Sequence, residues 1–495
     1  MRPGPGRDAR RTRTIVRSPG EDFAGDSVQW LGRSVPLTFE HVPRAEARDP
    51  RRPLRPEALH PRTATVYKRV RTPREALPMD FSYSPRLVRL KESAVALAQK
   101  IEAYEDECEL AGGLGPESRD ALRRIVLDSG LQAMNAPVEW GGAGLSWTEQ
   151  VTVEEELGTL TNGLWAAVWR PTAAALLAST PEQRERYLFP ENRGERFGAR
   201  AITEPEAGSD PRRIATVAER RPGGYRITGE KWFVTMGDVA DYLIVLAVVQ
   251  PDGAPTMFLV DKDTPGVRLL ETPRYSHNFA FEHPHFSLDG VEVGEDAVLG
   301  SVGDGLALVQ ATFFEERVLV AAHAVGAAER ALRLAADWAR ERVQGGKPII
   351  KHQLIQAMLA DSATDIAVNR MLVHRVAWDI DQGGDPKTLN AKVAMAKVSA
   401  TEAAGRVVDR AVQIFGGRGF IRDNPVERLY RDVRVDRIWM GTSEVQRLMI
   451  ANEIDKRGLP GLLHFPAAAP DAPDPAATAV SADDAGEALL EGASR

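Results

Sequence analysis

The sequence predicts an α+β protein in which a helical region, a β region and a second helical region follow one another. Three observations predict this order. From Pro85 to about Arg200, apolar residues recur at spacings of three and four, as on one face of a helix. From Ala201 to about Gly300, short apolar runs alternate with Gly, Pro and Asp, which is typical of strands and turns. From Gly305 to Arg457, long amphipathic stretches return and predict three or four helices packed as a bundle.

A chain of 495 residues is long enough for two to four domains. We expect an N-terminal helical domain at residues 79–200, a β domain at residues 201–300 and a helical bundle at residues 301–457. Residues 1–78 are rich in Arg and Pro, and residues 458–495 are rich in Ala, Pro and Asp. Neither segment has a sustained apolar periodicity, so we expect a disordered basic extension and a disordered tail.

Charge and cysteine content exclude several classes of protein. Residues 1–78 carry 17 Lys and Arg against 9 Asp and Glu, so the remaining chain has a charge of −15 within a total of −7. An acidic body does not suit nucleic acid, although the basic extension leaves such binding open as an alternative. The single cysteine, Cys108, excludes an intramolecular disulfide and suits a reducing compartment, so we expect a cytoplasmic protein. The longest apolar run, residues 242–249, is too short to span a membrane and predicts a buried strand.

Five short motifs carry the functional signal. Residues 201–210 read AITEPEAGSD, and residues 229–235 read GEKWFVT. Residues 341–353 read ERVQGGKPIIKHQ, residues 413–420 read QIFGGRGF, and residues 437–448 read RIWMGTSEVQRL. The glycines of GGRGF do not follow a strand, so they do not predict a dinucleotide-binding Rossmann loop. Any nucleotide must be held in another way.

Together and in this order, the five motifs resemble those of the acyl-CoA dehydrogenase flavoproteins, over roughly residues 85–457. The resemblance implies an N-terminal α-helical domain, a middle β-barrel domain and a C-terminal four-helix bundle, assembled as a homodimer or homotetramer. It also implies FAD as the cofactor, an acyl-CoA thioester as the substrate and an electron-transfer flavoprotein as the electron acceptor. The implied reaction is α,β-dehydrogenation to the trans-2-enoyl-CoA, with hydride transfer to flavin N5.

The resemblance assigns flavin contacts to the first two motifs. A flavin that becomes an anion on reduction needs hydroxyl and N–H donors and a flat apolar wall. By the family's pattern, Phe233 lies at the ring face, where most members have Trp, and Thr235 lies at N5. The other contacts implied here are Ile202, Thr203, Gly208 and Ser209, and Ser209 also lies on the thioester side.

The later motifs are implied to bind the other half of FAD. In the family, the arginine at the position of Arg342 pairs with the FAD pyrophosphate across a subunit interface, because its guanidinium fork matches phosphate oxygens. Gly345 stands where members usually have a Phe against the adenine. The remaining contacts implied for FAD are Gln353, Gln413, Gly416, Gly417, Thr442 and Glu444.

The last motif lacks the residue that many members use as the catalytic base. There, the residue before Gly-Thr is a glutamate, but here it is Met440. Isovaleryl- and long-chain-type members instead take the glutamate from an earlier helix, immediately before an arginine. Glu316 precedes Arg317 in TFFEERVLVAAHAVG, so we expect Glu316 to abstract the α-proton. Glu315 should point about 100° away around the helix and is the weaker candidate.

A thioester α-proton is only weakly acidic, so its carbonyl must be polarised. In the family the flavin ribityl hydroxyl and the main-chain N–H at the base's usual position do this, and the Met440 N–H is the equivalent main-chain donor. Apolar neighbours at Phe313, Phe314, Trp439 and Met440 are expected to raise the pKa of Glu316 by desolvation. The substrate contacts implied are Ser209, Arg317, Trp439, Met440 and Gly441.

Other functions stay open at this point. A flavin oxidase or monooxygenase could use the same scaffold, and so could a non-catalytic flavin-binding partner subunit. The thioester could belong to a carrier protein instead of coenzyme A. The segment HNFAFEHPHF holds His277, Glu282, His283 and His285, which could suggest a metal site, but the resemblance implies no metal.

Overall fold

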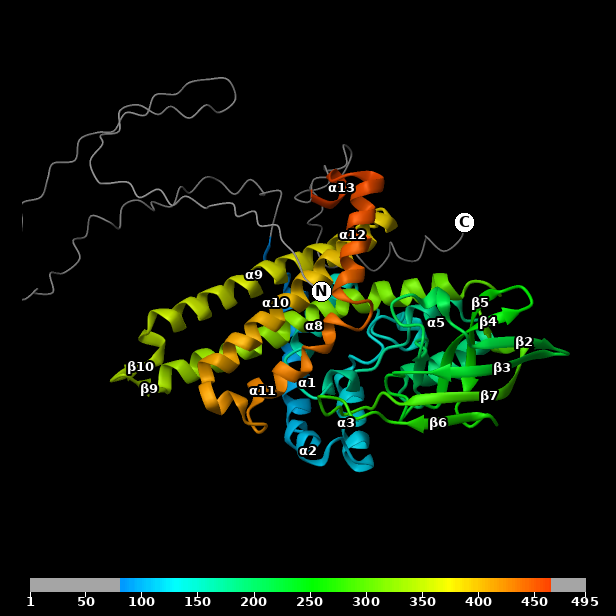
Figure 1. The fold of residues 1–495 in the computed structure, drawn as a ribbon, viewed down its shortest axis with the longest axis horizontal. Helices are drawn as coiled ribbons and strands as arrows, with labels where there is room; N and C mark the ends of the chain where they lie inside the picture. Colours follow the sequence, from blue (N-terminus) through cyan, green and yellow to red (C-terminus); the bar gives the residue numbers. More distant parts are fainter. Residues whose placement is uncertain (1–80, 464–495) are drawn as a thin grey trace, which may run out of the picture. The chain divides into compact units, whose positions relative to one another are not determined.

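The computed structural model describes residues 81–463 (Figure 1). The basic extension expected at residues 1–78 lies outside the described residues, as does most of the expected tail. The described part of that tail contains a short helix, α13 (Pro460–Leu463), which follows the bundle. Within residues 81–463, every helix is too short or too polar to cross a lipid bilayer.

The N-terminal region is helical, as the apolar periodicity predicts. The first helix begins at Pro85, and the Ser84 hydroxyl accepts a hydrogen bond from the Leu87 N–H, which caps it. Its buried face includes Leu97 and Ile101, which join the core formed with the next helices. The helices of this region are α1 (Pro85–Glu102), α2 (Glu105–Ala111), α3 (Pro116–Ser129), α4 (Trp147–Leu157), α5 (Ala173–Ala178), α6 (Pro181–Gln183) and α7 (Phe189–Asn192).

The middle region is one mixed sheet in the order β6-β7-β3-β2-β4-β5-β8, with β1 pairing in parallel with β4. The run at residues 242–249 forms most of β4 and is almost entirely buried, so the predicted buried strand is confirmed. The strands are β1 (Gly198–Ala201), β2 (Val217–Arg221), β3 (Gly224–Lys231), β4 (Tyr242–Gln250), β5 (Ala254–Asp261), β6 (Val267–Glu271), β7 (His285–Gly294) and β8 (Val298–Leu299).

Strand β1 matters for the site because it presents its side chains to two different sides. Ala199 and Ala201 belong to the core of the sheet. Since successive side chains of a strand alternate, Arg200 projects to the opposite side. Gly198 has no room for a side chain, because a Cβ there would lie 2.5 Å from the ring carbon Cζ of Tyr242. Close packing at Gly198 thus fixes the strand that carries Arg200.

The C-terminal region is a bundle in which α10 contacts α8, α9 and α12. Its core is rich in alanine, and small side chains let the long helices approach closely. Figure 1 shows the β9–β10 hairpin at the far end of the bundle from the sheet. The elements are α8 (Gly305–Glu341), β9 (Val343–Gln344), β10 (Lys347–Pro348), α9 (Gln353–Asp381), α10 (Pro386–Phe415), α11 (Pro425–Asp432) and α12 (Ser443–Arg457).

Helix α8 joins all three regions, because it contacts α4 and α5 as well as β5 and the bundle helices. Two glycines allow the close crossing of α4 and α8. A Cβ at Gly326 would collide with the carbonyl oxygen of Glu155, and a Cβ at Gly158 would collide with that of His323. This contact sets the position of α8 against the N-terminal helices, and therefore the position of Glu315 and Glu316.

Candidate active site

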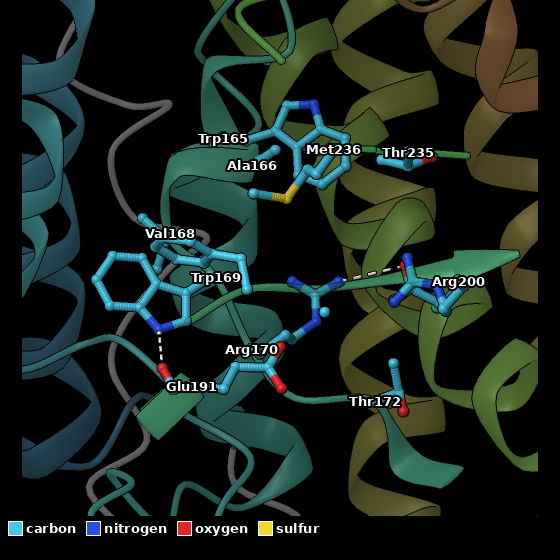
Figure 2. Close-up of a pocket in the computed structure, with 13 residues that line it drawn as sticks. Trp165, Ala166, Val168, Trp169, Arg170, Thr172, Glu191, Arg200, Thr235 and Met236 are labelled. Atoms are coloured by element: carbon cyan, nitrogen blue, oxygen red, sulfur yellow. Dashed lines mark hydrogen bonds and ion pairs between the residues drawn. The ribbon is translucent and has the colours of Figure 1, made fainter. Parts of the chain in front are cut away.

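A cavity lies where the N-terminal helices, β1 and α8 meet (Figure 2). Its lining combines aromatic and aliphatic side chains with charged ones. Both Glu316 and Thr235, which were predicted from separate motifs, line this cavity. Its lining residues are Trp165, Ala166, Val168, Trp169, Arg170, Thr172, Glu191, Phe197, Gly198, Arg200, Thr235, Met236 and Glu316.

Glu316 is buried on α8 and is paired with two arginines. Its Oε1 atom lies 3.0 Å from Nη1 of Arg200, and its Oε2 atom lies 3.4 Å from Nη2 of Arg170. Figure 2 shows the guanidinium groups of Arg170 and Arg200 close together in the cavity. Glu316 therefore lies in a buried cluster of charges rather than in an apolar pocket.

The expected rise in the pKa of Glu316 was wrong in sign. Burial acts to raise the pKa, but the guanidinium groups of Arg200 and Arg170 outweigh it, so the net pKa is lowered. The apolar side chains expected around Glu316 have other partners. Phe314 packs edge-on against Trp147, and the guanidinium of Arg317 lies 5.7 Å from the ring centroid of Phe313.

Arg170 follows the short 3-10 helix at residues 164–167, and its side chain is only 9% exposed. Besides Glu316, it faces Glu154 of α4, with Nη1 and Oε2 3.5 Å apart. Both separations exceed the 2.7–2.9 Å or so of a strong charge-assisted hydrogen bond. Within the described residues, the buried Nε of Arg170 has no hydrogen-bond partner. Burial raises the pKa of Glu154 to about 7.

Glu315 is also buried, but it has a structural set of contacts. Its carboxylate accepts hydrogen bonds from Nδ2 of Asn135 at 2.6 Å and from the Ala173 N–H at 3.1 Å. The same Asn135 amide donates to the carbonyl of Pro171 at 2.8 Å. Glu315 and Asn135 thus fix the loop that carries Arg170. Burial raises the pKa of Glu315 to about 7.

The first two motifs lie together at the end of the sheet. The N–H of Trp232 donates to the carbonyl of Thr203 at 2.8 Å, and Nζ of Lys231 lies 2.6 Å from Oε1 of Glu204. Lys231 is fully buried, and burial lowers its pKa to about 8. Glu204 also accepts from the N–H groups of Ala215 and Thr216. This network joins the TEPEAGSD turn to the strand that ends in KWFVT.

Most of the expected flavin contacts in these motifs are at least partly accessible. Phe233 has a left-handed φ of 55° and is 49% exposed, which is unusual for a large apolar side chain. Gly208 is exposed, and no atom lies within 4 Å of the position of an added Cβ. Ser209 is exposed, Thr203 and Thr235 are half-buried, and Ile202 is buried.

Three side chains donate hydrogen bonds to the carbonyl groups of the turn at Met440. The Met440 carbonyl accepts from Nε of Arg317 at 2.9 Å, and the Gly441 carbonyl accepts from Nζ of Lys397 and Nε2 of Gln446, each at 2.9 Å. Met440 has a left-handed φ of 53°. No acceptor among residues 81–463 takes its N–H group.

The other residues of the last motif are placed by this turn. Thr442 caps α12, because its hydroxyl accepts from the Val445 N–H, and Glu444 is exposed in the first turn. Met440 and Trp439 do not line the cavity of Glu316. The link is indirect, since Trp439 packs edge-on against Trp165, with ring centroids 5.9 Å apart.

The residues expected at the adenosine half of FAD lie elsewhere. Arg342 is the C-cap of α8 and comes 26 positions after Glu316. At about 1.5 Å per residue, this separation is about 39 Å along the helix axis. There, Trp338 stacks on Phe415, and the guanidinium groups of Arg342 and Arg418 lie over the Trp338 ring. The other members of this group, all exposed, are Gln353, Gln413, Gly416 and Gly417.

The local backbone explains why position 345 is a glycine. Gly345 and Gly346 connect β9 to β10 and have φ values of 61° and 77°. A two-residue hairpin turn with two positive φ angles strongly favours glycine. A phenylalanine at this position would be strained, so the turn accounts for the departure from the family's pattern.

The histidines of HNFAFEHPHF have separate roles. Nε2 of His277 lies 3.0 Å from Oδ1 of Asp432, and His285 stacks on Trp232 with ring centroids 4.3 Å apart. Burial lowers the pKa of His283 to about 4. Within the described part of the chain, no group of three or more His, Cys, Asp or Glu is arranged to hold a metal ion.

Sequence reasoning missed Arg170 and Arg200 as residues of the site. Each is a single charge within an apolar stretch, WAAVWRPTAAA and FGARAIT. An isolated arginine between residues that must be buried is itself a signal, because a buried guanidinium requires an anionic partner. The sequence could not show that both arginines share Glu316.

Three family models match this chain consecutively. The acyl-CoA dehydrogenase N-terminal, middle and C-terminal domain models match residues 88–195, 199–291 and 303–454. The chain is 34% identical over 365 residues to a 3-(aryl)acrylate reductase of Clostridium sporogenes, covering 72% of this chain and 95% of that protein. It is 37% identical over 339 residues to a benzylmalonyl-CoA dehydrogenase of Aromatoleum aromaticum, covering 68% and 89%.

Solved structures agree with the sequence matches. Butyryl-CoA dehydrogenase from Megasphaera elsdenii superposes with a TM-score of 0.71 at 29% identity, covering 76% of this chain and all of that one. The expected α+β class, with its helical, β and helical domains, is therefore confirmed.

Proposed function

Because the chain belongs to the acyl-CoA dehydrogenase family of FAD-dependent oxidoreductases, we propose that it dehydrogenates an acyl-CoA thioester to the trans-2-enoyl-CoA, with Glu316 as the base. One observation carries this proposal. A buried, ionised carboxylate on α8 lines the same cavity as Thr235, the residue expected at the reactive edge of the flavin. The relatives' names, a reductase of acrylates and a dehydrogenase of a CoA thioester, fit chemistry at a CH–CH bond.

The residues at the end of the sheet fit a flavin. Phe233 is an exposed aromatic side chain, and there is open space at the position of a Cβ added to Gly208. The hydroxyl groups of Thr203, Ser209 and Thr235 supply polar contacts around this surface. When bound, FAD supplies the acceptor for the hydride that leaves the β-carbon.

Glu316 would take the α-proton on a carboxylate oxygen as the β-hydrogen leaves as a hydride. The pairing with Arg170 and Arg200 keeps Glu316 ionised, which a base requires. The Met440 N–H would donate to the thioester carbonyl. Having Met in place of Glu at this position leaves that donor unchanged, and Arg317 and Lys397 hold the turn through its carbonyl oxygens.

The site requires more than one chain in this proposal. Arg342 is about 39 Å along α8 from Glu316, which is too far for the two ends of a single FAD bound within one chain. A homodimer or homotetramer would bring Arg342 of one chain to the flavin site of another, and light scattering tests this assembly. We further propose an electron-transfer flavoprotein as the acceptor and the cytoplasm as the location.

An anaerobic titration with straight, branched, aromatic and dicarboxylic acyl-CoA thioesters tests the function. We expect at least one class to bleach the visible band of the FAD-loaded protein, and the bleached band to return slowly in oxygen. Rapid return in oxygen would favour a flavin oxidase or monooxygenase. If no thioester bleaches the band, whether it is linked to coenzyme A or to a carrier protein, the result would favour a non-catalytic flavin-binding subunit.

A further inference from the structure

Two cations share one catalytic carboxylate in the cavity, and this arrangement has a consequence for the substrate. Arg200 contacts Glu316 at 3.0 Å, while Arg170 reaches Glu316 and Glu154 only at 3.4 and 3.5 Å. Arg170 is almost completely buried and its Nε has no partner in the described chain. A guanidinium has five N–H donors, so the pair of arginines has unused capacity for an anion.

The same contacts oppose the role of Glu316 as a base. A guanidinium stabilises the carboxylate and makes it a weaker proton acceptor, whereas efficient proton abstraction requires a base whose pKa lies near the operating pH. Glu316 would gain basicity if another anion took its place on the arginines. A neutral acyl chain cannot do this, because it carries no acceptor for the N–H groups.

We propose that the acyl group of the substrate carries a second carboxylate, which binds Arg170 and Arg200 and releases Glu316 to abstract the α-proton. This inference rests on the proposed dehydrogenase function. Both arginines touch the carboxylate that must reach the α-carbon, so the second carboxylate lies only a few carbon atoms away from that carbon. The substrate class is therefore the monothioester of a short-chain dicarboxylic acid.

The surroundings of the arginines support a binding role. Arg200 projects from β1, and its side chain is 21% exposed, so a ligand in the cavity can reach it. Arg170 is held in place by its own loop, because Glu315 and Asn135 fix that loop at Ala173 and Pro171. The guanidinium of Arg170 thus stays in the cavity when Glu316 leaves it.

A matched pair of thioesters tests the proposal. Glutaryl-CoA and pentanoyl-CoA have acyl chains of equal length and differ in a terminal carboxylate against a methyl group. In anaerobic single-turnover reduction of the FAD-loaded protein, we expect the second-order rate constant of flavin reduction for glutaryl-CoA to exceed that for pentanoyl-CoA by at least roughly 100-fold. Equal rates, or faster reduction by pentanoyl-CoA, would overturn the carboxylate site and leave the dehydrogenase function intact.

Arg200→Gln gives a second test. The preference for glutaryl-CoA should fall at least roughly 10-fold, because one of two charge-assisted partners is lost. The readout is the ratio of the two rates, because Glu316 loses a pairing cation with either thioester. An unchanged ratio in a folded, FAD-loaded variant would contradict a role of Arg200 in selection. Arg193→Gln, which removes an exposed surface pair with Glu195, is the matched control and should change neither rate.

Calorimetric binding separates this inference from the dehydrogenase function. Tighter binding of glutaryl-CoA than of pentanoyl-CoA, without flavin reduction by either, would support the carboxylate site and overturn the dehydrogenase function. Flavin reduction by both thioesters, with equal binding affinity, would support the dehydrogenase function and overturn the carboxylate site. If the protein shows no preferential binding and no flavin reduction, both the carboxylate site and the dehydrogenase function are overturned.

Discussion

Nη1 of Arg200 lies 3.0 Å from Oε1 of Glu316, which joins a strand of the middle domain to a helix of the C-terminal bundle. This ion pair defines the electrostatics of the site. It lowers the pKa of Glu316, which contacts Arg170 through its other oxygen.

The pH dependence of flavin reduction should reflect the lowered pKa of Glu316. Burial acts to raise this pKa, but Arg200 and Arg170 lower it below the ordinary value of 4.5. Because the carboxylate is the active form in the proposed mechanism, the acid limb that Glu316 contributes to flavin reduction should have its midpoint below 4.5. An acid limb near neutral pH that persists in Glu154→Gln would contradict the pairing of Glu316 with the two arginines.

Lys231→Met should destabilise the protein strongly. Lys231 is fully buried and pairs with Glu204 at 2.6 Å, so its removal leaves a buried carboxylate without a cation, at a cost of about 3–5 kcal/mol. Chemical denaturation measures the free energy of unfolding. The double variant Lys231→Met, Glu204→Gln should be more stable than Lys231→Met alone, and a double variant that is equally unstable would argue against the ion pair.

Gly326→Ala should disrupt the crossing of α4 and α8. An added methyl group collides with the Glu155 carbonyl, and the helices must separate at a cost of about 1–3 kcal/mol in unfolding free energy. Gly405→Ala is the matched control within α10, because no atom lies within 4 Å of the added Cβ. It should stabilise the helix by about 0.5–1 kcal/mol. Equal stability of the two variants would contradict the close crossing.

Arg342→Gln should weaken FAD binding without affecting the chemistry at saturating FAD. Losing a guanidinium that pairs with phosphate oxygens should lower the affinity at least roughly 10-fold. Fluorescence of released flavin during dialysis measures this loss. Arg340→Gln removes a nearby exposed arginine that pairs with Asp337 and should retain FAD. Equal retention of FAD by both variants would remove Arg342 from the cofactor site.

Local patterns in the sequence were enough to predict most of the fold. The buried run at residues 242–249 became β4, and the apolar periodicity after Gly305 became the long helices of the bundle. These features depend on neighbouring residues, so they can be read from the sequence. The short helix α13 was missed because its Leu-Pro-Gly sequence is typical of a loop.

The electrostatics of the site could not be predicted in the same way. Glu316, Arg170 and Arg200 come from three segments that no spacing rule connects. The sequence placed Glu316 beside phenylalanines, which suggested an apolar environment and a raised pKa. Around a helix, adjacent residues point in different directions, and here Glu316 faces the arginines of two other regions. Only the tertiary structure shows whether burial or pairing with arginine dominates the pKa of Glu316.

The most direct test of the central claim compares Glu316→Gln with Glu315→Gln in anaerobic single-turnover reduction of the FAD-loaded protein by its thioester substrate. We predict a rate roughly 100- to 10,000-fold lower for Glu316→Gln, because the amide cannot accept the α-proton. Glu315→Gln should lower the rate far less than Glu316→Gln, because the amide oxygen still accepts from one of the two donors, Asn135 or the Ala173 N–H, and Glu315 takes no proton in the proposed step. An unchanged rate in Glu316→Gln would contradict its role as the base.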